Sequence, residues 1–466
     1  MSKPICAIST PNGVGGIAVI RVSGDGAAAC VDRIFRARKE GDNVSSQRSH
    51  TVKLGSIIDL ENAQTELDEV VVTRFCAPHS YTGEEVVEIA CHGSVYIQQR
   101  IVQLLLQSGC TMARAGEFTQ RAFLNGRLDL SQAEGVADLI SSTSAAGNRL
   151  AMRQMKGGVS NEIRALRDQL MHLSTLLELE LDFSEEDVLF ADRNELAALT
   201  TKIEQRIDQL TKSFAVGNAI KNGIPVAIVG QTNVGKSTLL NALVGEERAL
   251  VSEIHGTTRD TLEDLLVING LLFRFIDTAG IRETQDVVEQ MGIDRSYQTI
   301  SKAQIVLWII DGSHHDASAD RIAKQIRTHA SASRILPVLN KADKIAKGER
   351  VGVMEQYRQE GMEQPIFISA KSGENLDALK LMLVQIAQIP DLSKADTYLT
   401  NLRHYEAFMN AQEALRRFHS NMSQNLSSDL LAEDLRACLE HLGEVTGQIT
   451  SSDILQNIFS HFCIGK

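Results

Sequence analysis

The spacing of hydrophobic positions predicts an α+β domain in residues 1–118. Short runs there alternate or are apolar throughout, as strands do, and two longer runs have helical spacing. Gly13 and Gly15 lie beside an expected strand, but the full glycine pattern of a dinucleotide-binding turn is absent. The expected strands are Ile5–Ile8, Ile17–Val22, Val52–Asp59, Leu67–Phe75 and Glu85–Ala90, and the expected helices are Ala27–Phe35 and Ile97–Ser108.

Apolar residues recur at helical spacing over long stretches of residues 119–221, and again in residues 389–466. Leucine and isoleucine recur every three or four residues from Ile163 to Leu177 and from Leu196 to Phe214, which predicts a helical bundle. Core packing alone accounts for these stripes. Five carboxylates lie between them, in Asp182–Asp192. We interpret this cluster as a solvated loop, because no second set of metal ligands is evident nearby.

Residues 222–388 have a third pattern, in which apolar strands alternate with helical segments. This alternation predicts an α/β domain with a mostly parallel sheet. Because helical stretches precede and follow it, the simplest architecture is an α/β domain inserted into a helical domain. The expected strands are 225–230, 265–269, 271–276, 304–310, 334–339 and 365–369.

Composition narrows the class of protein. A chain of 466 residues is too long for one core, and 43% hydrophobic with 23% charged residues is typical of a soluble globular protein. The net charge of −12 argues against non-specific coating of nucleic acid, but it is compatible with a nucleic-acid partner held by a local basic patch or by a second protein. No run of 18 apolar residues predicts a membrane span. Seven scattered cysteines without a C-x-x-C pair, and no signal peptide, suggest the reducing cytoplasm.

The strongest chemical signal is the stretch Val226–Ser237, an apolar strand followed by G-x-x-x-x-G-K-S and a helix-prone run. Gly230 and Gly235 allow backbone N–H groups to face a polyphosphate. Lys236 would reach the β- and γ-phosphates, and the Ser237 hydroxyl would bind Mg²⁺. The pattern predicts a phosphate-binding loop.

Four further motifs follow expected strands or connect them. Asp277 is placed to hold Mg²⁺ through water, and the Gly280 N–H could meet a γ-phosphate. Thr258, in Gly256–Asp260, is a second candidate Mg²⁺ ligand on a switch segment. Asp343 could accept the N1 and N2 protons of guanine, which adenine lacks, and backbone N–H groups of Ser369–Lys371 could meet guanine O6. The motifs together predict GTP.

The residue after the Asp277–Gly280 motif is Ile281, where small signalling GTPases carry a water-positioning glutamine. An isoleucine cannot hold water, so another group must support hydrolysis. Arg282, Glu283 and Glu289 are the candidates in sequence. The alternative is a GTPase too slow to matter without a partner.

These motifs resemble the GTPase domain of the tRNA modification GTPase family MnmE, also called TrmE. The resemblance covers the whole chain, including Thr10–Gly24, Pro78–Ile89, Gly116–Leu130 and the terminal Cys463–Lys466. It implies a multidomain α/β and all-α protein, with a Ras-like P-loop GTPase domain inserted into a helical domain. An α+β domain that binds folate and forms the dimer precedes them. The terminal motif also explains a cysteine fourth from the end, because Gly465 and Lys466 do not suit prenylation.

The family resemblance implies a cytoplasmic homodimer that acts with the FAD protein MnmG, as a heterotetramer, on tRNA. Together they would add an aminomethyl or carboxymethylaminomethyl group to C5 of the wobble uridine, with a one-carbon unit from a tetrahydrofolate derivative. The folate contacts would be Arg21, Glu88, Arg127 and Lys466, where Arg127 replaces a common lysine. Cys463 is open to two interpretations, a nucleophile with a lowered pKa beside Lys466 or a packed thiol.

The resemblance also implies hydrolysis triggered by dimerisation of the GTPase domains, with K⁺ in the role of an arginine finger. The K⁺ ligands would be Asn233, Ser252, Ile254 and Thr257, and Glu289 would act on the attacking water, alongside Lys236 and Asn233. The residues expected to contact GTP are Asn233, Val234, Gly235, Lys236, Ser237, Thr238, Ser252, Glu253, Ile254, His255, Gly256, Thr257, Thr258, Asp277, Thr278, Ala279, Gly280, Asn340, Lys341, Asp343, Ser369, Ala370 and Lys371.

Two other functions are compatible with parts of the sequence. A regulatory or ribosome-assembly GTPase would use its flanks as an RNA-binding module, which requires a basic surface and no folate affinity. The acidic composition and the terminal Cys463–Lys466 motif argue against it. In the other, the first 120 residues are a folate enzyme in their own right and the GTPase domain is only a clamp.

Overall fold

The computed structural model describes residues 2–60, 65–182, 193–245, 263–276, 300–314, 319–330, 333–358, 362–390, 397–424, 426–449, 452–460 and 462–465. The chain divides into two compact units. The first comprises Met1–Ala137, Arg153–Ile203 and Asn410–Lys466, and the second comprises Asp138–Met152 and Glu204–Met409. The four-domain division at 118, 221 and 388 remains a prediction.

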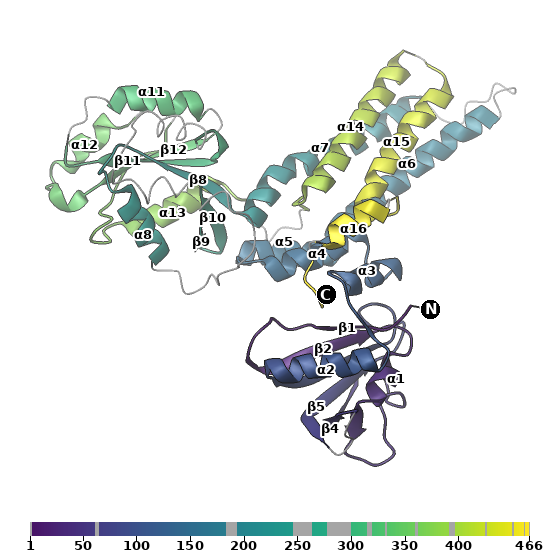
Figure 1. Ribbon diagram of the computed structural model, residues 1–466. Helices are drawn as coiled ribbons and strands as arrows, with labels where there is room; N and C mark the ends of the chain where they lie inside the picture. Colours follow the sequence, from purple (N-terminus) through teal and green to yellow (C-terminus); the bar gives the residue numbers. More distant parts are fainter. Residues whose placement is uncertain are drawn as a thin grey trace. The chain divides into compact units, whose positions relative to one another are not determined.

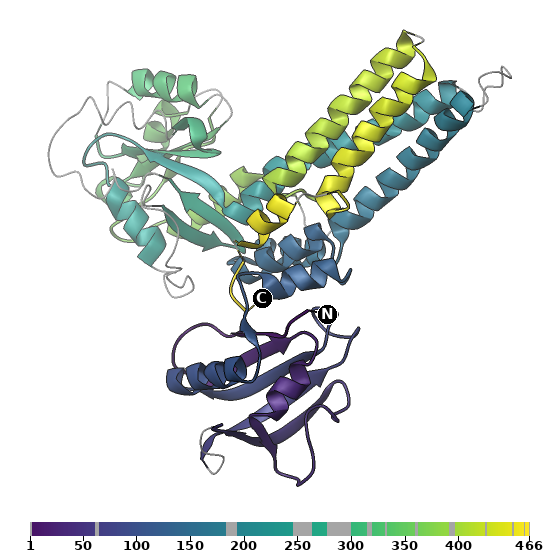
Figure 2. The same ribbon diagram turned by 45° about the vertical axis from the view of Figure 1, so that its right-hand side comes forward.

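The first unit contains a seven-stranded sheet in the order β3-β4-β5-β6-β2-β1-β7. Neighbouring strands are antiparallel, except that β1 and β7 are parallel. Helices α1 (Ala27–Asp32) and α2 (Val95–Gln107) cover one face, where they share a core with Ile20, Val22 and Ile89 (Figure 2). The strands are β1 (Ile5–Ile8), β2 (Gly15–Ser23), β3 (Phe35–Ala37), β4 (Thr51–Ile58), β5 (Glu66–Phe75), β6 (Val86–Gly93) and β7 (Thr111–Met112).

The prediction of a helix over Ala27–Phe35 is wrong at the carboxyl end. Helix α1 ends at Asp32, and Phe35 begins strand β3, where it pairs with Ile57 of β4. The Asp32 carboxylate accepts the N–H of Val44 at 2.5 Å, in the loop that follows β3. Sheet pairing with a distant strand therefore overrides the local helical spacing.

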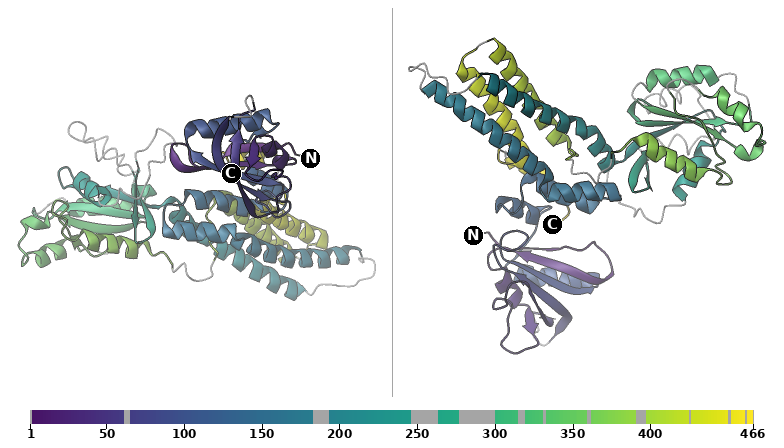
Figure 3. Two further views of the ribbon diagram at one scale, coloured as in Figure 1. Left: turned by 90° about the horizontal axis from the view of Figure 1, so that it is seen from below. Right: turned by 180° about the vertical axis from the view of Figure 1, so that it is seen from behind.

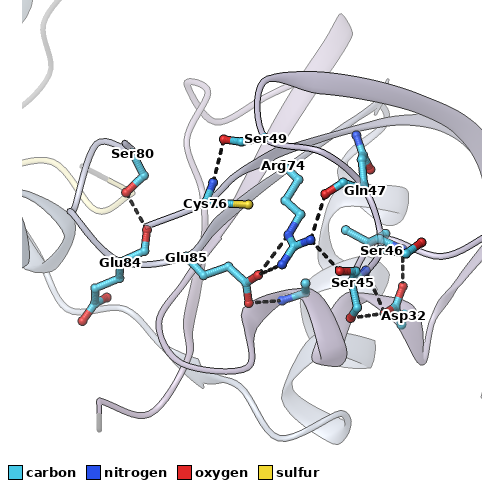
Figure 4. A network of polar contacts seen from close by, with 12 residues as sticks. Asp32, Ser45, Ser46, Gln47, Ser49, Arg74, Cys76, Ser80, Glu84 and Glu85 are labelled. Atoms are coloured by element: carbon cyan, nitrogen blue, oxygen red, sulfur yellow. Dashed lines mark hydrogen bonds and ion pairs between the residues drawn. The ribbon is translucent and has the colours of Figure 1, made fainter. Parts of the chain in front are cut away.

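An arginine connects three parts of this domain (Figure 4). Arg74 of β5 donates to Glu85 Oε1 at 3.0 and 2.5 Å, and to the carbonyl oxygens of Ser45 and Gln47 at 2.5 and 2.8 Å. The other Glu85 oxygen accepts the Ala28 N–H at 3.1 Å. Since Gly26 at the N-cap of α1 has no side chain, Glu85 satisfies an N–H group that the helix leaves unpaired.

The rest of the first unit is mainly helical. Helix α6 lies beside α15 and the adjoining halves of α7 and α14 (Figure 3). Arg167 of α6 donates to the Leu439 carbonyl oxygen of α15. A Cβ atom at Gly443 would lie 2.6 Å from Arg167 Nη1, so any larger residue there would displace the end of the Arg167 side chain. The helices are α3 (Glu117–Leu124), α4 (Leu130–Ser141), α5 (Ala145–Met155), α6 (Gly158–Asp182), α7 (Arg193–Asn222), α14 (Leu402–Ser423), α15 (Ser428–Thr446) and α16 (Ser452–Ser460); α4, α5, α7 and α14 continue across the division between the units.

The second unit contains a six-stranded sheet in the order β13-β12-β11-β8-β10-β9 (Figure 1). Its neighbouring strands are parallel except for the β10–β9 pair, as the alternating pattern predicts. Helices α8 and α13 pack on one face, and α11 and α12 pack on the other. The elements are β8 (Ile224–Val229), α8 (Lys236–Gly245), β9 (Asp264–Ile268), β10 (Leu271–Phe275), β11 (Ile305–Asp311), α11 (Ala319–His329), β12 (Arg334–Asn340), the short 3₁₀ helix η2 (Ala342–Lys344), α12 (Arg350–Gln356), β13 (Ile366–Phe367) and α13 (Leu376–Ala387).

Candidate functional site

The phosphate-loop motif connects β8 to α8, as the sequence predicts. A Cβ atom at Gly230 would lie 2.3 Å from the Ile309 carbonyl oxygen, and one at Gly235 would lie 2.3 Å from Asn340 Nδ2. Both glycines have positive φ, of 153° and 98°. Asn233 has φ of 62°, a left-handed conformation that asparagine tolerates. The loop geometry therefore requires both glycines of the motif.

Lys236, the first residue of α8, has its ammonium group against this loop. Nζ donates to the carbonyl oxygens of Gly230 at 2.8 Å and Gln231 at 2.6 Å. Burial lowers the pKa of Lys236. The side chains of Ser237 and Thr238 are exposed at the amino end of α8. A cation, a helix amino terminus and hydroxyl groups are together suited to bind phosphate and Mg²⁺.

The two candidate base-binding loops are the loop that begins at Asn340 and contains Asp343, and the loop that begins at Ser369 and continues to Glu374. Asn340 joins both of them to the phosphate loop. Its Nδ2 donates to the Val234 carbonyl oxygen at 2.8 Å, and its Oδ1 accepts the Ala370 N–H at 2.9 Å. The residue is 3% exposed. Because parallel strands β8, β12 and β13 end at one edge of the sheet, three loops far apart in sequence meet at this amide. The structure thus brings three of the five predicted motifs together.

The candidate base-binding carboxylate is exposed and held by a neighbouring loop. Asp343 Oδ1 accepts the Ser369 hydroxyl at 2.7 Å. This hydrogen bond lowers the pKa of Asp343, so the group is ionised at neutral pH. An ionised carboxylate is an acceptor only, which suits the adjacent N–H groups of guanine.

Asp311, at the carboxyl end of β11, belongs to the same edge and was not singled out from the sequence. Lys341 has φ of 65° and donates through Nζ to Asp311 Oδ2 at 2.6 Å. Burial would raise the pKa of Asp311, but hydrogen bonds from Lys341 and Ser313 outweigh it and lower the pKa to about 2. A polar residue directly after an apolar strand, as in the other motifs, is the signal that could have identified it.

Two of the predicted folate residues form a pair on the N-terminal sheet. Arg21 of β2 lies directly opposite Glu88 of β6 and donates to its Oε1 from Nε at 2.9 Å and Nη2 at 2.8 Å. The guanidinium carbon lies 5.2 Å from the ring centroid of Tyr81 and 5.7 Å from that of Phe118. Phe118 is fully buried, so the groups left to suit a planar heterocycle with a charged tail are the cation, the carboxylate and the partly exposed Tyr81 ring. Arg127 is exposed.

The C-terminal motif lies along the end of β1. The Ser9 hydroxyl donates to the Gly465 carbonyl oxygen at 3.1 Å, and the Gly116 N–H donates to the Cys463 carbonyl oxygen at 3.4 Å. A Cβ atom at Gly465 would lie 2.3 Å from the Ile8 carbonyl oxygen, so the close contact depends on glycine. Cys463 is free and exposed. Residues 463–465 therefore pack against Ile8, Ser9 and Gly116.

Other predicted site residues lie outside the described residues, and their roles remain predictions. In the residues that the structure describes, no group of three or more histidine, cysteine, aspartate or glutamate side chains could hold a metal ion, and no helix is long and apolar enough to cross a membrane. The predicted residues outside the described ranges are Ser252, Glu253, Ile254, His255, Gly256, Thr257, Thr258, Asp277, Thr278, Ala279, Gly280, Ile281, Arg282, Glu283, Glu289 and Lys466, together with the acidic residues of 183–192.

Two family models match the sequence, and together they cover both flanks of the nucleotide-binding motifs. "GTP-binding protein TrmE N-terminus" matches residues 4–127, and "MnmE helical domain" matches residues 130–463. The chain is 51% identical over 463 residues to tRNA modification GTPase MnmE of Parabacteroides distasonis, with 99% of each chain covered. It is 50% identical over 465 residues to the protein of the same name from Bacteroides thetaiotaomicron, again with 99% of each covered.

Among solved structures, Era of Aquifex aeolicus bound to GDP and AlF₄⁻ is 30% identical to this chain, and the alignment covers 41% of this chain and 66% of the Era chain. The TM-score of 0.29 is too low to relate the two folds.

Proposed function

We infer that this chain, which belongs to the MnmE family of tRNA modification GTPases, hydrolyses GTP and takes part in the modification of tRNA. The observation that carries the nucleotide assignment is the Asn340 amide. It joins a loop suited to phosphate, through Val234, to a loop suited to guanine, through Ala370. One ligand that needs both loops at once is a guanine nucleotide.

The finer proposal concerns the reaction. With the FAD protein MnmG, the chain would add an aminomethyl or carboxymethylaminomethyl group to C5 of the wobble uridine of certain tRNAs. It would act in the cytoplasm as a homodimer, within a heterotetramer. The full-length similarity to proteins named tRNA modification GTPase supports this reaction.

The side chains of the nucleotide site have separable roles in the proposed hydrolysis. The Lys236 ammonium would balance charge on the β- and γ-phosphates, and Asp343 would select guanine. Ser237, Thr258 and Asp277 would hold Mg²⁺, and Asn233, Ser252, Ile254 and Thr257 would hold K⁺, with both ions supplying positive charge where negative charge develops. Glu289 would orient the attacking water.

The K⁺ proposal predicts that GTP turnover depends on which monovalent cation is present. Full-length protein assayed at equal ionic strength should turn over GTP at least about tenfold faster in KCl than in NaCl, because removing one charge-stabilising group usually costs that much or more. Lys236→Ala should be slow in both salts. Equal turnover of the wild type in K⁺ and Na⁺ would show that the cation mechanism is wrong for this chain.

The folate derivative would bind in the N-terminal domain, with residues from the C-terminal motif. Arg21 and Glu88 would face the heterocycle, Arg127 and Lys466 would meet the anionic tail, and Cys463 would be near the one-carbon unit. The residue types fit, because the Arg21–Glu88 pair offers N–H donors and a carboxylate beside the rings of Tyr81 and Phe118.

Deletion of residues 463–466 should abolish binding of a tetrahydrofolate derivative in calorimetry and leave GTP turnover unchanged. The C-terminal segment contacts Ile8, Ser9 and Gly116 in the first unit, whereas the nucleotide motifs belong to the second. Unchanged folate affinity in the deleted protein would rule out a role for this motif.

A further inference from the structure

Arg350, the first residue of α12, contacts both candidate base-binding loops. Its Nη2 donates to the Ala342 carbonyl oxygen at 2.7 Å, and its Nη1 forms an ion pair with Glu374 Oε1 at 2.6 Å. Its guanidinium carbon lies 5.7 Å from the ring centroid of Phe367, in the strand between the two loops. The Arg350 side chain is 17% exposed, so these contacts are shielded from water.

The first contact acts on the peptide next to the base-binding carboxylate. Ala342 directly precedes Asp343 and is buried. Its N–H donates to the Ile368 carbonyl oxygen at 3.0 Å, while its carbonyl oxygen accepts from Arg350. The backbone before Asp343 is thus held from both sides, which constrains the direction of the Asp343 Cα–Cβ bond.

The second contact reaches the same carboxylate through the other loop. The backbone carbonyl oxygen of Glu374 accepts the Ser369 N–H at 3.1 Å, and the Ser369 hydroxyl donates to Asp343 at 2.7 Å. By pairing with the Glu374 side chain, Arg350 fixes the residue that orients Ser369. The two routes from Arg350 therefore converge on Asp343.

Arginine suits this position for a geometric reason. Its planar guanidinium presents several N–H donors in fixed directions and stacks on aromatic rings, so one group can serve a carbonyl, a carboxylate and Phe367 together. A lysine ammonium is a point charge on a flexible chain and cannot hold the same three contacts at once.

We propose that Arg350 is a positioning residue for guanine specificity, which holds the Asp343 carboxylate in register with the Ser369–Lys371 loop. The proposal rests on the proposed function, because it requires a guanine base at this site. Arg350 acts through Ala342 and Glu374. Its removal should therefore weaken the contacts to guanine N1 and N2 and leave the chemistry at the phosphates intact.

The test compares GDP with IDP, which lacks the exocyclic N2 amino group, by calorimetry on full-length protein with Mg²⁺. Arg350→Met should lower GDP affinity about tenfold, the scale of one lost charge-assisted hydrogen bond, and should lower IDP affinity less. The GDP-to-IDP affinity ratio should therefore fall. The turnover number at saturating GTP should be unchanged, and Arg350→Lys should restore only part of the ratio.

Arg358→Met is the matched control, because Arg358 lies just after the end of α12, is 60% exposed and pairs with Glu355 across 3.5 Å. It should leave the ratio as in the wild type. If circular dichroism shows that Arg350→Met does not fold, the GDP-to-IDP affinity ratio is measured on Glu374→Gln instead. This variant removes the ion pair with Arg350 and keeps the Ala342 contact. A lowered ratio in Glu374→Gln supports the proposal.

A folded Arg350→Met with the wild-type ratio would overturn the proposal, as would an unchanged ratio in Glu374→Gln when Arg350→Met is unfolded. Both results would leave the proposed function standing, provided that the wild type prefers GDP to ADP. A wild type without that preference would instead refute the nucleotide assignment, and the role of Arg350 with it.

Discussion

The polar residues at the edge of the nucleotide-binding sheet differ in burial and in hydrogen bonding. Asn340 is buried and hydrogen-bonded to two other loops, whereas Asp343 is exposed to solvent. The sequence predicts that these motifs meet, because each follows a strand. It does not predict that a side-chain amide joins them, since that contact depends on the spacing of residues 234, 340 and 370 in the folded sheet.

At the same scale, Asp311 gives a pH-dependent prediction. Its folded pKa of about 2 lies below the ordinary 3.8, so its ionised form is favoured by folding. The stabilisation is complete well above pH 3.8 and is lost as the pH falls toward 2. Asp311→Asn should therefore lower the free energy of unfolding by about 1 kcal/mol at pH 7, after allowance for solvent screening, and by less at pH 3.

Urea denaturation of both proteins at pH 7 and pH 3 measures this difference. Asp377→Asn, which alters an exposed carboxylate 3.8 Å from Lys380, is the control and should change stability by less than about 0.5 kcal/mol. The same loss for Asp311→Asn at both pH values would contradict the assigned cause.

At the scale of elements, the apolar patterns predict where the longer strands lie. The buried strands β8, β11 and β12 begin and end within one or two residues of the predicted positions. The patterns do not predict β7, because two residues are too few to show a period, nor β3, because its pairing with β4 comes from a distant part of the chain.

The Arg74 network tests how such distant parts are joined. Arg74→Met removes the partner of Glu85, whose side chain is 20% exposed and lies at the start of α1. Since a largely buried carboxylate is left without its cation, we expect a loss of about 3 kcal/mol in the free energy of unfolding by urea.

Arg38→Met is the control, because Arg38 directly follows β3 of the same sheet, is 72% exposed and pairs with Glu69 of β5 at 3.0 Å. It should cost less than about 0.5 kcal/mol. Equal losses for Arg74→Met and Arg38→Met would mean that the network does not stabilise the domain.

At the scale of the whole molecule, the predicted fold class is confirmed. The match to the helical domain spans residues 130–463, which include the helices before and after the six-stranded sheet in sequence. The N-terminal match covers the α+β part. Periodicity predicts the helices on either side of the sheet. It cannot predict that α7 and α14 each contribute to both compact units, because this depends on helix packing rather than on spacing within a helix.

Modification of the wobble uridine by this tRNA modification GTPase is a proposal, and mass analysis of tRNA nucleosides tests it most directly. In cells that lack the protein, we predict that C5-modified wobble uridine disappears from the affected tRNAs. Wild-type protein supplied from a plasmid should restore it, and Lys236→Ala should not. Undiminished C5-modified uridine in cells without the protein would contradict the claim.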